Sequence, residues 1–145
     1  MDIKIKAIIL TTLLNSANAN LITTSSSYTV KSTVSMLSKD LESKNFKIFA
    51  KIDHKKNAIG AGLKMKVATL IVFGKPKAGT LLMNENIKMG LELPLKFLVH
   101  ENDKNEVVVT YKDPLSYKTT YKLSNTKLLT KIRSVLKKIT DKLKK

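Results

Sequence analysis

The sequence predicts a single domain that mixes helices and strands, and three observations lead to this prediction. Residues 46–52 alternate apolar and polar side chains, which is the period of a strand with one buried face. Apolar runs at 95–99 and 107–111 flank a polar turn, as in a β-hairpin. Residues 124–143 repeat apolar side chains at helical spacing. A chain of 145 residues is long enough for one domain and too short for two ordinary ones.

The segment from Met1 to Ala19 has the pattern of a secretory signal peptide. Lys4 and Lys6 make a basic start, Ala7 to Leu14 is apolar, and small residues end the segment. The apolar run is too short to span a bilayer. We therefore expect a removed signal peptide and a mature domain of residues 20–145, periplasmic or secreted, in a bacterium. The alternative is a short N-terminal core strand or helix.

The composition narrows the range of partners. The formal net charge is +16, yet all but one of the 27 basic residues are lysines, and Arg133 is the exception. Phosphate and base recognition favour arginine forks, and aromatic residues make up only 6% of the chain. We expect no nucleic-acid partner and interpret the charge as solvated surface, with a polyanion or membrane patch as the alternative. The lack of cysteine excludes disulfides, thiolate nucleophiles and zinc–thiolate sites.

The N-terminal third predicts one helix after a polar start. Residues 20–27 are rich in Ser and Thr without periodicity and are interpreted as a lead-in, and residues 28–31 as a short strand. Ser32 or Thr33 is suited to cap a helix that runs to about Lys44, because these side chains accept bonds from free backbone amides.

A strand and a loop follow this helix. Asn45 suits a left-handed helix end, and residues 46–52 then alternate as a strand. Ala58 to Leu63 contains two glycines, which argues against a regular helix, so we interpret this segment as a connecting loop or one turn.

The middle of the chain predicts strand, tight loop, helix, turn and strand. Met65 to Phe73 is almost continuously apolar towards its end, which is typical of a central strand covered on both faces. Residues 74–79 supply two glycines and a proline for the loop. Thr80 is expected to cap a helix that ends near Gly90, and Pro94 introduces the next strand.

The C-terminal third predicts a hairpin and a long helix. Residues 95–101 and 107–111 form the hairpin, Asp113–Pro114 closes it, and residues 117–122 are interpreted as another short strand. Ser124 or Asn125 caps the last helix, residues 124–143, which has an apolar stripe and lysines on its remaining surface. We expect the stripe to pack on the sheet; the alternative is a helix lying on an anionic membrane.

Several motifs resemble one known family. They are FGKPKAGTLLM at Phe73–Met83, GLELPLKFLV at Gly90–Val99, IDH at Ile52–His54, an alanine at Ala58, and YKDP at Tyr111–Pro114. Together they are similar to the domain of unknown function 302 family. Two separated motifs in the right order make the resemblance fairly specific.

The resemblance covers roughly residues 32–122. It implies an α+β domain in which antiparallel strands carry helices, and a compact unit that is often dimeric, so a homodimer is expected. It implies no activity. The chain departs from the family pattern at Lys75, at residues 66–69 and at His100, where the family tends to have Asn, an Arg-Pro-Thr and an aromatic residue.

The candidate ligand site is the glycine loop, with Gly74, Lys75, Lys77, Gly79 and Thr80 as its residues. A loop between a strand and a helix can bind an anion through free amides and flanking lysines. An ATP-type phosphate loop is not predicted, because such a loop needs lysine directly after its second glycine. The alternative is a purely structural turn.

Asp53 and His54 are the side chains we add to this candidate site. Histidine at a strand end often acts as an acid, base or ligand. His54 and His100, with a methionine, are weak candidates for a soft metal or haem, because no metal-ligand spacing links them. The alternative is a structural role in which Asp53 caps the following turn.

No catalytic residue can be assigned. The sequence has no Gly-x-Ser-x-Gly elbow and no cysteine, and its carboxylates are scattered over loops. The leading hypothesis is a secreted or periplasmic binding or accessory protein with no cofactor that the sequence can name. The alternative is docking on an anionic membrane or polyanion, and the third is an enzyme of unknown reaction class.

Overall fold

The computed structural model describes residues 20–145, so the predicted signal peptide lies outside the described residues. Within this range, five strands form one sheet in the order β1-β5-β4-β3-β2, with every neighbouring pair antiparallel. The strands are β1 (Leu21–Ser25), β2 (Lys47–Asp53), β3 (Ala68–Gly74), β4 (Leu95–Glu101) and β5 (Val107–Lys112). The helices are α2 (Val30–Ser43), α3 (His54–Gly60), α4 (Pro76–Glu85), the 3-10 helix η1 (Ile87–Leu91), α5 (Ser116–Tyr121) and α6 (Thr126–Asp141).

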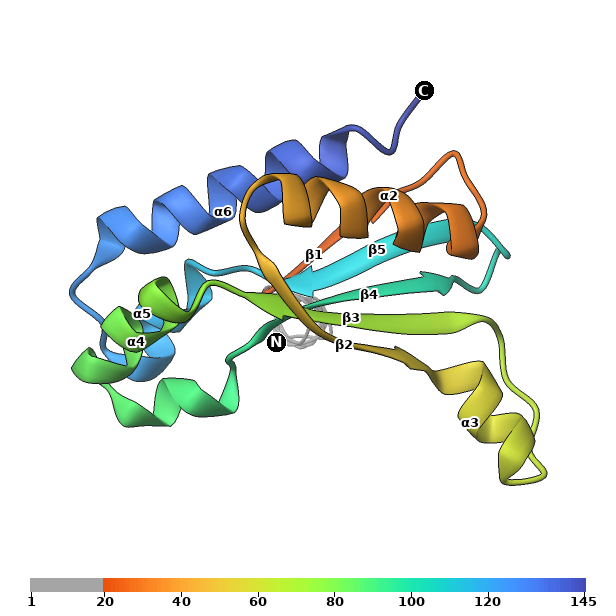
Figure 1. The fold of residues 1–145 in the computed structure, drawn as a ribbon, viewed down its shortest axis with the longest axis horizontal. Coiled ribbons are helices and arrows are strands. Elements are labelled where there is room, and N and C mark those ends of the chain that lie inside the picture. The colour runs from red at the N-terminus through yellow and green to blue at the C-terminus, as the bar shows by residue number, and fades with distance from the viewer. Residues whose placement is uncertain (1–19) are drawn as a thin grey trace, which may run out of the picture.

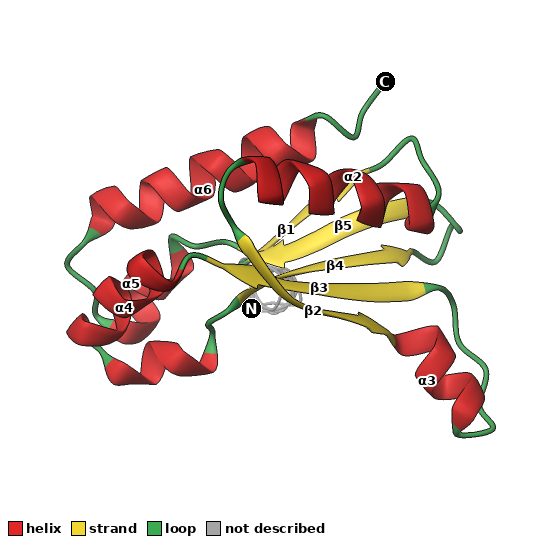
Figure 2. Ribbon diagram, viewed as in Figure 1, coloured by secondary structure: helices red, strands yellow, loops and turns green. Residues whose placement is uncertain are grey.

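The helices are distributed unevenly around the sheet. Figure 1 shows α2 and α6 on one face of the sheet, while α4, η1 and α5 gather at one end and α3 projects at the other. Figure 2 shows the same two layers by secondary structure. The predicted α+β class, an antiparallel sheet with packed helices and a terminal amphipathic helix, is therefore confirmed.

The core fills the space between the sheet and these two helices. Phe73, Phe97 and Tyr111 lie side by side on β3, β4 and β5, with ring centroids 4.6 and 5.1 Å apart. Leu37 and Leu41 of α2 cover them together with the stripe of α6, whose fully buried members are Leu129, Leu136 and Ile139. Each side chain buried in this way stabilises the fold by about 1.5–3 kcal/mol.

One carboxylate joins the two covering helices. Asp40 of α2 lies 2.7 Å from the ammonium of Lys142, just after α6, and 2.7 Å from that of Lys44. Partial burial raises the pKa of Asp40, but the hydrogen bonds from Lys142 and Lys44 outweigh it and hold that pKa below its usual value. The ends of α2 and α6 are thus tied together at neutral pH.

The opposite face of the sheet has no helix on it in residues 20–145. One row across this face consists of Thr23, Thr110, Leu98, Leu70 and Ile52, which are paired in register from β1 to β2. The three apolar side chains of the row are only partly buried. The prediction that the central strand is covered on both faces is therefore wrong for the described residues: β3 has helices on one side alone.

Several elements form as predicted. β2, β3 and the β4–β5 hairpin lie within two or three residues of their predicted bounds. Asn45 has φ +59°, the left-handed conformation expected at the end of α2. The Asn125 side chain accepts a 3.1 Å hydrogen bond from the Leu128 amide and caps α6. In these places a local side-chain preference and the tertiary packing agree.

Two errors concern the N-terminal segment. Residues predicted as a polar lead-in form the edge strand β1, because Ser and Thr tolerate a strand with one exposed face. Residues predicted as a short strand begin α2 instead. Thr29 is its N-cap and accepts a 3.2 Å hydrogen bond from the Ser32 amide, so the helix starts earlier than expected.

Two further errors concern short helices. The first half of the predicted loop at 58–63 belongs to α3, which has no buried residue and starts from the Asp53 cap, and the second half is a turn as expected. The predicted strand at 117–122 is α5: Tyr117 is buried against the core, and the Ser116 hydroxyl donates a 2.7 Å bond to the Asp113 carbonyl. Neither helix has the apolar periodicity that the sequence interpretation relied on.

Candidate functional site

The predicted glycine loop is a direct junction between a strand and a helix. β3 ends at Gly74 and α4 begins at Pro76, a position where the missing amide hydrogen is not needed. The Gly79 amide donates a 3.0 Å bond to the Lys75 carbonyl, so Gly79 already lies within the first turn. The prediction that Thr80 caps this helix is therefore wrong. The helix also ends at Glu85, and a separate 3-10 helix follows it.

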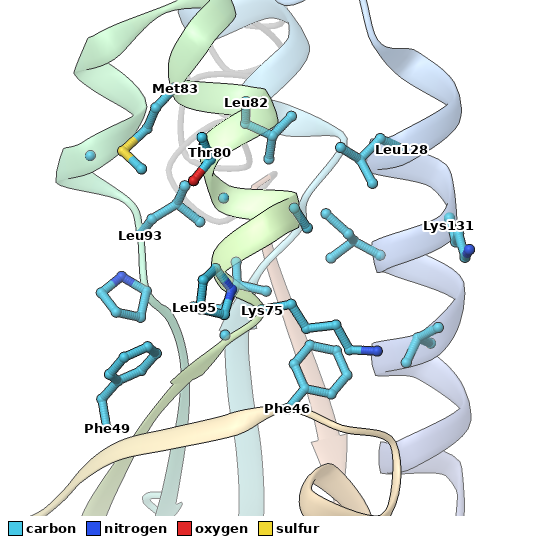
Figure 3. Close-up of a pocket in the computed structure, with 18 residues that line it drawn as sticks. Phe46, Phe49, Lys75, Thr80, Leu82, Met83, Leu93, Leu95, Leu128 and Lys131 are labelled. Atoms are coloured by element: carbon cyan, nitrogen blue, oxygen red, sulfur yellow. The ribbon is translucent and has the colours of Figure 1, made fainter.

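A pocket of about 470 Å³ opens beside this junction. Its walls come from the start of β2, the β3–α4 junction, α4 itself, the segment between η1 and β4, and one side of α6 (Figure 3). Its volume lies within the usual range of ligand sites, about 300–1,000 Å³. The lining includes four of the five residues of the predicted loop site, namely Gly74, Lys75, Gly79 and Thr80. Lys77, the fifth, is exposed and does not line the pocket.

The two junction glycines lie opposite the other walls of the pocket. A Cβ atom on Gly74 would lie 3.6 Å from the Phe49 ring and 3.7 Å from Pro94. A Cβ atom on Gly79 would lie 3.4 Å from a methyl group of Leu93. Both are ordinary contacts, so alanine fits, whereas a larger side chain at either position meets the opposing wall. The Leu93–Pro94 peptide bond that shapes this wall is cis.

The pocket is apolar with a basic edge. Apart from Thr80, Lys75 and Lys131, the side chains that line it are apolar, and Leu82 and Leu95 form buried parts of its wall. The Lys75 ammonium lies 4.6 Å from the centre of the Phe46 ring, so a cation–π contact positions it at the pocket. Among the described residues, no acidic side chain lines the pocket and no carboxylate pairs with either lysine.

Asp53 and His54 do not belong to this pocket. Asp53 pairs with Thr69 at one end of the β2–β3 ladder, and Lys47 pairs with Gly74 at the other. At about 3.3 Å per residue, the two ends are on the order of 17 Å apart. The Asp53 carboxylate accepts a 2.9 Å bond from the Lys56 amide and caps α3, and His54 is the first residue of that helix. The expectation that these side chains share a site with the glycine loop is therefore not met.

The two histidines are not neighbours either. His100 lies on β4, and β3 separates it from the end of β2, which puts it two strand spacings, about 10 Å, from the backbone beside His54. Its Nε2 is 3.1 Å from the Thr110 hydroxyl, which is 3.0 Å from that of Thr23. No group of three or more potential metal ligands occurs in residues 20–145.

A polar cluster outside the pocket, which the sequence interpretation missed, joins two of the family motifs. Glu92, from the Gly90–Val99 motif, accepts a 2.6 Å bond from Lys112 of the YKDP motif and a 2.7 Å bond from the Tyr121 hydroxyl. Partial burial raises the pKa of Glu92, but the bonds from Lys112 and Tyr121 outweigh it and lower that pKa overall. Burial also raises the pKa of Tyr117, whose ring lies 5.6 Å from the Lys112 ammonium.

This cluster connects the end of the sheet to the helices beside it. Asp113, also in the YKDP motif, bonds the Leu115 amide at 3.0 Å and pairs with Arg133 of α6 at 3.0 Å. Glu92 and Asp113 thus each pair with a cation and not with one another. The signal that could have revealed this is the occurrence of opposite charges in two motifs that flank one hairpin.

The comparisons with known proteins place the chain in a family. The model of the family "Domain of unknown function DUF302" matches residues 22–143. The fold agrees with the crystal structure of an uncharacterised conserved DUF302 protein from Bacillus stearothermophilus, with a TM-score of 0.78 over 86% of this chain and 98% of that one, at 16% identity. The chain belongs to the DUF302 family.

Similar segments also occur within larger proteins. The chain is 33% identical over 97 residues to the protein named fluoride-specific ion channel FluC 1 of Brucella suis biovar 1 (strain 1330), and equally so to that of Brucella abortus biovar 1 (strain 9-941). The match covers 67% of this chain and 38% and 36% of those proteins, so the chain spans little more than a third of their length. None of the helices in residues 20–145 has the length and apolar content needed to cross a bilayer.

Proposed function

We propose that this DUF302 protein is a small-ligand-binding or accessory domain whose ligand occupies the pocket beside residues 74–80. The observation that carries the proposal is the cavity itself: an apolar volume of about 470 Å³ on which five separate segments converge. A concave, mostly apolar cleft of this size with a few polar groups is typical of a small-ligand site. No paired acid and base from residues 20–145 lines it, which favours binding over catalysis.

A variant in which a large side chain fills the pocket tests this proposal. Ala78 lines the cavity, whereas the neighbouring Lys77 on the same helix turn does not. We expect apolar ligands to raise the melting temperature of the native protein, because a ligand that binds only the folded state stabilises it. Ala78→Phe should abolish this rise, and Lys77→Phe, which adds the same ring outside the pocket, should leave it intact. If the ligand still raises the melting temperature of the Ala78→Phe variant, the ligand binds outside this pocket and the proposal is wrong.

A second candidate function is docking on an anionic membrane, and the α3 arm supports it. This arm, residues 54–66, projects from the body of the domain (Figure 1). It exposes Ile59 (63%), Leu63 (65%) and Met65 (41%). Lysines accompany these apolar side chains, namely Lys55, Lys56, Lys64 and Lys66. Exposed apolar groups among cations suit the surface of an anionic bilayer.

The relatives named as fluoride channels are consistent with this second candidate, since a domain within a channel protein works beside a membrane. Co-sedimentation with vesicles of anionic lipid is the test. Binding should fall on Ile59→Ser with Leu63→Ser and with added salt. The double variant Lys137→Gln with Lys138→Gln on α6 is the control. It lowers the net charge without changing the apolar side chains of the arm. Deleting α6 is not a usable test, because its apolar stripe is part of the core.

We also propose that the protein is a homodimer outside the inner membrane. Support for the dimer is the face of the sheet that carries Leu70 and Leu98 without a covering helix in the described residues. Support for the location is the sequence pattern of residues 1–19 alone. The mass of the protein purified from its host tests the location, because removal of that segment shortens the chain by a defined amount.

A further inference from the structure

We infer that the ligand of this pocket is a single-chain amphipathic anion, with its apolar chain in the cavity and its carboxylate beside Lys75. The inference rests on the proposed function above, that the pocket binds a ligand, and it adds the chemical class of that ligand. Two independent features of the site lead to it: the apolar character of the walls, and the sign of the charges at the edge.

The walls select an apolar body. Figure 3 shows Leu82, Met83, Leu93 and Leu128 around the cavity, from α4, the segment before β4, and α6. Thr80 is the one uncharged polar side chain of the lining in the described part of the chain. A ligand with several polar groups would leave them without partners there, which costs binding energy. An extended hydrocarbon chain loses nothing, and each buried methylene strengthens binding by about fourfold.

The edge selects a negative head group. Lys75 extends over the Phe46 ring towards α6, which carries Lys131 (Figure 3). Contact with the ring holds the Lys75 ammonium at the edge instead of letting it point freely into solvent. Both charged groups of the lining are cations, and neither forms an ion pair with another residue among 20–145. An anionic head gains a partner here, whereas a cationic head is repelled.

The discriminating experiment compares four probes by titration calorimetry below their micelle concentrations. They are dodecanoate, dodecanol, the dodecyltrimethylammonium ion and acetate. We expect dodecanoate to bind about tenfold more tightly than dodecanol, the cationic amphiphile to bind more weakly than both, and acetate not to bind. Dodecanol binding as tightly as dodecanoate would overturn the anionic class.

Two substitutions connect these affinities to the structure. Lys75→Gln should weaken dodecanoate binding about tenfold and leave dodecanol unchanged. Lys77→Gln, an exposed lysine of the same helix outside the pocket, should change neither. Equal loss with both variants would mean that net charge, not the position of Lys75, attracts the anion, and would overturn the assigned site of the head group.

The two levels of the proposal fail separately. If dodecanol and dodecanoate bind equally and Ala78→Phe abolishes both, the pocket is a binding site but the anionic class is wrong. If neither amphiphile binds, or Ala78→Phe leaves their binding intact, the proposed function and this inference fall together. If Lys75→Gln weakens the binding of dodecanoate alone, both the proposed function and the anionic class of the ligand are supported.

Discussion

The carboxylate of Glu92 lies 2.6 Å from the ammonium of Lys112, and this contact fastens the segment before β4 to the end of β5. The side chain of Glu92 is 18% exposed, so water screens the pair only in part. The same oxygen accepts a hydrogen bond from the Tyr121 hydroxyl. One side chain thus connects the end of η1, the hairpin and α5.

Glu92→Gln should therefore lower the free energy of unfolding by about 1–2 kcal/mol, because it removes a charge-assisted bond from a partly buried group. Urea unfolding measures the change. The double variant with Lys112→Met isolates the pair, and its coupling energy should be about 0.5–1 kcal/mol. A coupling energy near zero would show that solvent screens the pair completely.

The ion pairs of Asp40 with Lys44 and Lys142 should make the folded protein less stable in acid. The pKa of Asp40 is lowered in the folded state from the ordinary value of 3.8, so the unfolded chain takes up the proton first as the pH falls. The stabilisation is complete at neutral pH and is lost as the pH falls from about 5 through the folded-state pKa. Asp40→Asn should cost about 1 kcal/mol at neutral pH and nothing at low pH. Unfolding of both proteins across this range checks the sign.

Gly79→Ala should stabilise the protein. Gly79 lies inside α4, and its new Cβ atom would meet Leu93 at an ordinary contact distance of 3.4 Å. Alanine in a helix is favoured over glycine by roughly 0.5–1 kcal/mol. The midpoint of urea unfolding should rise accordingly. Gly62→Ala is the opposite case, because Gly62 has φ +74° and a side chain there is strained.

Leu136→Ala measures how firmly α6 is built into the domain. Leu136 is 1% exposed, and its truncation should cost about 2–5 kcal/mol. Lys138→Ala on the exposed side of the same helix should change stability by less than about 0.5 kcal/mol. Similar small losses for both would mean that α6 packs loosely on the sheet.

Leu98→Lys tests the proposed dimer. Leu98 lies in the middle of the uncovered row of the sheet, between Leu70 and Thr110. A charge there opposes burial against a second copy, so light scattering after gel filtration should detect a monomer where the native protein is a dimer. Ser35→Lys, on the exposed side of α2, is the matched control and should keep the native mass.

The sequence predicted the elements whose local pattern and tertiary role coincide. β4 is an apolar run between Pro94 and a polar turn, and α6 has a full apolar stripe behind an Asn125 cap, so both were found close to their true bounds. α3 and α5 have no such stripe: the Asp53 cap starts α3, and the burial of Tyr117 against the core holds α5 in place. Such contacts have no local signature.

The candidate site was predicted in part. The glycines and lysines of the β3–α4 junction indicated a loop site, and the pocket lies beside that junction. The pocket itself could not be predicted, because Leu93 and Leu128 reach it from segments far apart in the chain. Asp53 and His54 were grouped with the junction by chemical type alone, and the ladder of β2 and β3 separates them from it.

The position of β1 determines the order in which the sheet can be completed. β1 pairs with β5 alone, so Leu21–Ser25 has no strand partner until Val108–Lys112 has been synthesised. Among the strands of residues 20–145, β1 is made first and finds its partner last, and its pairing has the largest sequence separation of the strand pairs. Until it pairs, the backbone edge of β5 is open to a strand from another chain, and that interval is when the protein is most exposed to aggregation.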